Sequence, residues 1–223
     1  MSETNLDILF HFCYTYVVKM KSLNIIQKLK SLNLLIFTPR EFKNIFNLSD
    51  KTARVYISRN LKTGLFEKLR SGLYILKDSS PSPYQIANRL YQPSYISLDK
   101  ALAHYGMIPE TVFSVTSITT KPTREFTTEC GLYIYQTIKL QAFTGYRLVN
   151  LDGQDILMAE PEKALVDYLY FVSLGKIELS DRINLNNLSK NKVLSFAKLF
   201  NRPKLNRLIE QIYASTNNAP TIY

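Results

Sequence analysis

The sequence predicts an α+β protein built from two parts. Three helical patterns and a short β-hairpin pattern occupy residues 21–77. The segment 78–83 then interrupts every periodicity, because its two prolines and three serines favour neither a helix nor a central strand. Beyond it, segments rich in β-branched and aromatic residues occur among helical patterns. We therefore expect an N-terminal domain over 20–78, a linker over 79–83 and a mixed α/β domain over 84–223.

Composition limits the class of protein. Of the 223 residues, 46% are hydrophobic and two are cysteine, so the chain can bury a core and is no disulfide scaffold. Cys13 and Cys130 are expected to be reduced thiols in a cytoplasmic protein. The longest apolar stretch has eleven residues, whereas a membrane span requires roughly 20. No membrane partner is expected.

The first two helices of the N-terminal domain carry separate signals. The first has leucine and isoleucine at helical spacing, at Leu23, Ile26, Leu29 and Leu32. The second begins with a capping box, since Thr38 can cap the helix, Pro39 suits its first position and Glu41 can bond back. Residues 1–19 precede both helices as an N-terminal extension, which is either an extra helix or the product of an upstream start.

A third helix and a hairpin complete this domain. Ser49 is the expected cap of the third helix, and Gly64 is expected to end it. Two short strands are predicted over 65–69 and 73–76, with Gly72 in the turn between them. Three helices followed by a basic hairpin predict a winged helix-turn-helix, whose third helix enters the major groove of DNA.

The charge of the third helix supports a polyanionic partner. The chain has a formal net charge of +10, and residues 1–80 hold 13 Lys and Arg against 6 Asp and Glu. On a helical wheel the third helix has an apolar inner face and an outer face with four cations and no acid. The predicted contacts with double-stranded operator DNA are this outer face and the hairpin tip: Lys51, Thr52, Arg54, Val55, Ser58, Arg59, Lys62 and Arg70.

The second domain is predicted to mix helices and strands. Strands are expected over 112–119, 131–138 and 146–150. Helices are expected over 84–91, 97–104, 161–172, 189–200 and 203–213.

Several motifs resemble the AbiEi-type antitoxin family of bacterial abortive-infection (type IV) toxin–antitoxin systems. They are LKTGL at 61–65, SGLY at 71–74, ANRLYQPSYIS at 87–97, ALAHYGMIPE at 101–110, TTKPTR at 119–124 and AEPEKALVD at 159–167. The resemblance covers about residues 21–175. It implies a winged helix that represses the protein's own operon and a C-terminal domain that counters a nucleotidyltransferase-like toxin. Whether the toxin is contacted directly, and the oligomeric state, stay open.

A second concentration of basic residues lies near the end of the chain. Its cations, with no acid between them in the sequence, are Lys190, Lys192, Lys198, Arg202, Lys204 and Arg207. Two interpretations are open: an ordinary solvated helical face, or a secondary basic surface for phosphates, RNA or the toxin.

Signals for catalysis are weak, so no enzyme, metal or cofactor is predicted. The alternative is a DNA-acting nuclease targeted by the winged helix, for which the acids around Lys163 are the only suggestion. A nuclease core places an acid two residues before the lysine, but Pro161 stands there and marks a helix start. We instead expect Lys163 and Asp167 to pair on the helix surface. Tyr91, Tyr95, Tyr133 and Tyr135 could stack on bases, but they are expected in the core.

Overall fold

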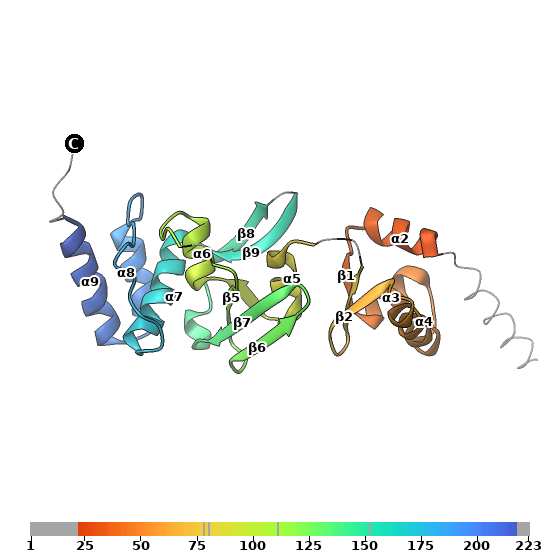
Figure 1. Ribbon diagram of the computed structural model, residues 1–223. Helices are drawn as coiled ribbons and strands as arrows, with labels where there is room; N and C mark the ends of the chain where they lie inside the picture. The colour runs from red at the N-terminus through yellow and green to blue at the C-terminus, as the bar shows by residue number, and fades with distance from the viewer. Residues whose placement is uncertain (1–21, 78, 80, 111, 152, 218–223) are drawn as a thin grey trace, which may run out of the picture. The chain divides into compact units, whose positions relative to one another are not determined.

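The structure is a computed structural model that describes residues 22–77, 79, 81–110, 112–151 and 153–217 (Figure 1). The chain divides into two compact units between Pro81 and Ser82, within the segment predicted as a linker. Both units combine helices with a β-sheet, so the α+β class is confirmed. The predicted extension over 1–19, and Cys13 within it, lie outside the described residues.

In its described residues, the N-terminal unit combines three helices with a three-stranded antiparallel sheet. Its elements are α2 (Ser22–Ser31), β1 (Ile36–Phe37), α3 (Pro39–Phe46), α4 (Asp50–Lys62), β2 (Phe66–Arg70) and β3 (Leu73–Leu76). The strand order is β1-β3-β2, with Ile36 opposite Ile75. Sequence analysis missed β1, because two residues are too few to show an alternating pattern.

The predicted start of α3 is confirmed. The backbone N–H of Glu41 donates to Thr38 Oγ1 at 3.2 Å, and the backbone N–H of Thr38 donates to Glu41 Oε2 at 2.7 Å. Pro39 is the first helical residue. This capping box satisfies two backbone donors at the helix end and sets the direction in which α3 leaves β1.

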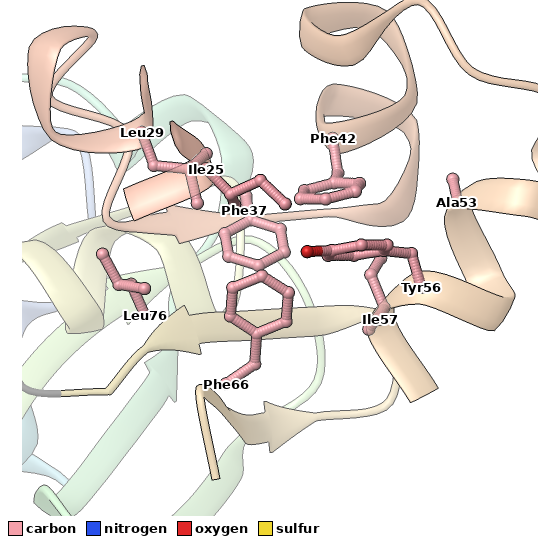
Figure 2. Packing of buried hydrophobic residues seen from close by; sticks show 9 residues of the cluster. All are labelled: Ile25, Leu29, Phe37, Phe42, Ala53, Tyr56, Ile57, Phe66 and Leu76. Carbon is pink, nitrogen blue, oxygen red and sulfur yellow. The ribbon is translucent and has the colours of Figure 1, made fainter. Parts of the chain in front are cut away.

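Apolar side chains from all three helices meet the sheet in one core (Figure 2). The rings of Phe37 and Phe66 lie edge to face with centroids 4.9 Å apart, and Phe42 stacks on Tyr56 at 5.6 Å. Burial of each such side chain stabilises the fold by roughly 1.5–3 kcal/mol. The whole cluster is Ile25, Leu29, Phe37, Phe42, Ala53, Tyr56, Ile57, Phe66 and Leu76.

The predicted apolar stripe of α2 is partly wrong. Ile25 and Leu29 are fully buried, whereas Leu23 is 65% and Leu32 is 49% exposed. Leu23 lies two residues before Ile25 and therefore on the opposite side of the helix. Leu32 follows Ser31, the last helical residue, so the helical repeat no longer applies to it.

The C-terminal unit is built on a six-stranded mixed sheet. Its strands are β4 (Ser94–Ile96), β5 (Val115–Thr119), β6 (Arg124–Thr128), β7 (Gly131–Thr137), β8 (Tyr146–Leu151) and β9 (Gln154–Ala159), in the order β6-β7-β5-β4-β9-β8. The pairs β4–β9 and β5–β7 are parallel, and the other neighbours are antiparallel. Tyr95, Tyr133 and Tyr135 are fully buried, as predicted. Tyr91, predicted to lie with them, is only half-buried.

Helices pack on this sheet and on one another. They are α5 (Pro83–Leu90), α6 (Leu98–His104), the 3-10 turn η1 (Leu140–Ala142), α7 (Pro161–Ser173), α8 (Lys190–Lys198) and α9 (Pro203–Asn217). The last three lie side by side (Figure 1). The final two residues of the predicted linker belong to α5, because Ser82 caps the helix and Pro83 is its first residue.

No helix among the described residues is long and apolar enough to cross a membrane.

Candidate nucleic-acid interface

The helix predicted to read DNA is α4, and its ends are fixed as the sequence predicts. Ser49 is the N-cap, and its side chain accepts from the backbone N–H of Thr52 at 3.1 Å. The Ser49 hydroxyl also donates to Thr52 Oγ1 at 2.8 Å. At the other end, Gly64 takes a φ of +75°, which permits the chain to turn toward β2. The two signals define a helix of 13 residues.

The inner face of α4 is buried as the helical wheel predicts. Ala53, Tyr56 and Ile57 lie in the core, and Asn60 is only 8% exposed. The Asn60 side-chain amide donates to the carbonyl of Tyr56 at 2.8 Å, so its polar group is satisfied inside the unit. These contacts fix the rotation of α4 about its axis and so determine which residues face solvent.

The outer face is exposed over its whole length. Lys51, Arg54, Val55, Ser58, Arg59 and Lys62 lie on it, and all six are exposed. Thr52 differs from the other predicted contacts, because it is half-buried and its hydroxyl is already engaged by Ser49. The structure therefore brings six of the seven predicted residues of α4 onto one accessible face.

The turn between β2 and β3 holds the eighth predicted residue. Arg70 ends β2, is half-buried, and donates from Nη1 to the carbonyl of Ser71 at 2.8 Å. Gly72 has a φ of +75°, in agreement with the predicted turn. Sequence analysis omitted Lys68, an exposed cation on the same strand. The position of Lys68, two residues before Arg70 in the only hairpin of this unit's described residues, could have identified it as a further candidate contact.

Residues 22–77 contain eleven Lys and Arg but only three acids. Each of the three acids has a contact outside the outer face of α4. Glu41 is held in the cap of α3, Asp50 pairs with Lys43 at 3.1 Å, and Glu67 pairs with Lys77 at 3.6 Å. The excess positive charge therefore has its densest concentration along α4, where four cations occur between residues 51 and 62.

Two cations of the predicted secondary basic surface have acidic partners. Lys190 pairs with Glu210 at 2.7 Å, and Lys192 lies 2.6 Å from Glu160 and 3.1 Å from Glu162. The acids missing from this stretch of sequence are thus supplied by other segments of the fold. Two of the six cations are therefore held in ion pairs, and a surface for phosphates, RNA or the toxin stays a prediction.

Arg202, a third cation of the predicted secondary basic surface, forms hydrogen bonds inside the C-terminal unit. Arg202 donates from Nε to Ser173 Oγ at 2.7 Å and from Nη2 to the Ser173 carbonyl at 2.9 Å. It therefore ties the loop before α9 to the end of α7. Lys198, Lys204 and Arg207 are exposed, and none of them makes an ion pair with another described residue.

The acid–lysine cluster at the start of α7 is buried, not on the surface as predicted. Lys163 and Asp167 are both 0% exposed and form an ion pair within one turn of α7. The Tyr95 hydroxyl donates to Asp167 Oδ2 at 3.0 Å, and Ser97 Oγ donates to the same oxygen at 2.8 Å. Ser97 is also the N-cap residue of α6, but its side chain bonds Asp167 and not the helix.

The pKa values in this cluster reflect burial. Burial lowers the pKa of Lys163 and raises that of Asp167, and in each case the partner's charge opposes the shift. Burial also raises the pKa of Glu162, but hydrogen bonds from its own backbone N–H and from Lys192 outweigh burial and leave that pKa below its usual value. The hydrogen bond to Glu160 raises the pKa of Lys192. The shifts of Lys163 and Asp167 accompany an ion pair within α7, and those of Glu162 and Lys192 accompany an ion pair between α7 and α8.

No family model matches the chain, and no curated protein matches it.

Proposed function

We propose that the protein is a DNA-binding transcriptional regulator whose N-terminal unit is a winged helix-turn-helix. The order helix, short strand, two helices and β-hairpin supports this assignment, with β1 completing a sheet beside the hairpin. The observation that carries the proposal is the exposed face of α4. It presents Lys51, Arg54, Arg59 and Lys62 with no acid along its length.

The mechanism follows from the dimensions of a helix and of DNA. A helix with its side chains is about 10–12 Å wide, and the major groove of B-DNA is about 12 Å wide. In this arrangement α4 lies in the groove, where Arg54 and Arg59 reach guanine edges or phosphates and Ser58 hydrogen-bonds to a base or phosphate. Arg70 contacts the backbone and contributes affinity that does not depend on sequence.

The proposed role of the C-terminal unit is that of an antitoxin against a nucleotidyltransferase-like toxin. Support for it comes from the AbiEi-type motifs, of which 87–97, 101–110 and 159–167 lie in this unit. The nuclease alternative is disfavoured by the burial of Lys163 and Asp167, which are enclosed in the unit and cannot touch a phosphodiester. We infer a regulator and not an enzyme.

Selection of duplexes from a random pool by the full chain tests the proposal. We expect one sequence to be enriched, with an affinity that falls steeply as salt rises, because binding releases counterions from the DNA. Arg54→Ala and Arg59→Ala are each expected to weaken binding to that duplex by about 1–3 kcal/mol if the arginine reaches a base.

A control with the same loss of charge separates specific contacts from net charge. Lys121→Ala combined with Arg124→Ala removes two exposed cations from the C-terminal unit, and we expect it to bind nearly as the unchanged protein does. Equal affinities for the Arg54/Arg59 double variant and the unchanged protein would contradict the assignment of α4.

A further inference from the structure

Val55 is an apolar residue in the middle of an otherwise polar helical face. Its side chain is 41% exposed. On the helix it has Lys51 one turn before it and Arg59 one turn after it, and Arg54 and Ser58 beside it. Every one of these neighbours is exposed and can hydrogen-bond. Val55 is thus the one side chain at the centre of the α4 face that cannot.

Neither packing nor helix stability accounts for a valine at this position. The core side of α4 is formed by Ala53, Tyr56 and Ile57, which point away from the exposed face. A β-branched residue is also a poorer helix former than alanine, lysine or arginine, because the helix restricts its χ1 angle. What Val55 offers at this position is a compact apolar surface directed at whatever α4 binds.

The major groove of DNA contains one apolar group, the C5-methyl of thymine. The edges of guanine and adenine present acceptors and donors there, and cytosine presents a donor beside a C5 hydrogen in place of the methyl. An apolar side chain against these bases leaves polar groups unpaired and contacts no methyl group. Arg59 and Lys51, on either side of Val55, can hold the helix against phosphates or guanines while a short side chain between them approaches the base edges.

We propose that Val55 contacts the C5-methyl group of a thymine, so that the operator carries thymine opposite the centre of α4. This inference rests on the proposed function, since it requires that α4 lie in the major groove. It adds a specific base to that function: the arginines and lysines supply affinity, and Val55 selects thymine against the three other bases at one position.

Uracil substitution isolates the contact, because uracil lacks only the methyl group of thymine. Each thymine of the selected duplex is replaced in turn by uracil, and the affinity of the full chain is measured by fluorescence anisotropy. We expect a loss of about fourfold at one position, corresponding to about 0.8 kcal/mol for one buried carbon group. Val55→Ala is expected to bind the unmodified duplex more weakly by a similar factor and to be indifferent to uracil at that position.

The variants also separate this inference from the proposed function. Val55→Ala improves helix propensity at an exposed site, so the unit is expected to stay folded. Val55→Thr keeps one methyl group and is expected to retain part of the sensitivity to uracil. Two results would contradict the thymine contact but leave the proposed DNA-binding function intact. In the first, a duplex is selected but no uracil substitution weakens binding. In the second, uracil weakens binding equally for Val55→Ala and for the unchanged protein. If no sequence is enriched at all, both the thymine contact and the proposed function are wrong.

Discussion

Lys163 and Asp167 form an ion pair that is closed off from solvent on α7, although they stand one helical turn apart where a surface pair is the usual outcome. Asp167 Oδ1 accepts from Lys163, and Oδ2 accepts from Tyr95 on β4 and Ser97 at the start of α6. The ammonium group of Lys163 also lies 5.1 Å from the centre of the Phe200 ring. One carboxylate therefore joins α7 to β4 and α6.

Asp167→Asn is expected to destabilise the C-terminal unit by about 3–5 kcal/mol, because it leaves the Lys163 ammonium buried without a counter-charge. Hydrogen exchange of the α7 amides in the full chain measures the loss. Lys163→Met combined with Asp167→Asn removes the unpaired charge and is expected to recover much of the lost stability. An equal cost for Asp167→Asn in both backgrounds would show that the two side chains are not coupled.

Lys192 is expected to stabilise the C-terminal unit only when its acidic partners are ionised. Burial raises the pKa of Glu162, but a backbone hydrogen bond and the contact with Lys192 together lower it below the usual 4.5. The contacts of Lys192 with Glu160 and Glu162 raise its own pKa above 10.5. A lowered carboxyl pKa gives stability that is present above about pH 4.5 and lost as the pH falls through the folded value. A raised lysine pKa gives stability that is present below 10.5 and lost at higher pH.

Lys192→Met should therefore be less stable than the unchanged protein at pH 7 by about 1 kcal/mol, since the lysine is partly exposed. We expect the difference to shrink as the pH falls below 4.5, measured by urea unfolding followed by circular dichroism. Lys198→Met, on the same helix, is the control and should show no such pH dependence. A difference for Lys192→Met that is constant with pH would mean that packing, not charge, accounts for it.

Arg202→Ala is expected to act on stability and not on DNA affinity. It removes two hydrogen bonds to Ser173, which is 1% exposed, and leaves that carbonyl without them. Loss of such partners costs about 1–3 kcal/mol. Arg207→Ala removes the same charge from an exposed site and is expected to change stability by no more than about 0.5 kcal/mol. Thermal unfolding of the two variants side by side measures the contrast, and equal melting temperatures would refute it.

Local signals predict much of this fold. The start of α3 follows from Thr38, the two ends of α4 follow from Ser49 and Gly64, and the start of α7 follows from Pro161, because caps and prolines act within a few residues. The exposed face of α4 follows equally well, since helical geometry and the apolar residues of one segment determine it.

The features that the sequence does not predict depend on distant partners. β4 has three residues and pairs with β5 and β9, so its position is set by neighbours and not by its own pattern. Spacing indicates that Lys163 and Asp167 can pair, but their burial depends on the surrounding sheet and helices. The ion pairs of the basic stretch near the end of the chain also depend on distant residues, because Glu160 and Glu162 approach Lys192 only in the folded unit.

Backbone amide chemical shifts of the full chain, recorded as the selected duplex is added, test the central claim most directly. We predict that the largest changes fall between Lys51 and Lys62 and around Arg70, with small changes at the buried pair of α7. Changes concentrated in the C-terminal unit, with α4 unaffected by a duplex that binds, would contradict the assignment of α4 as the helix that reads DNA.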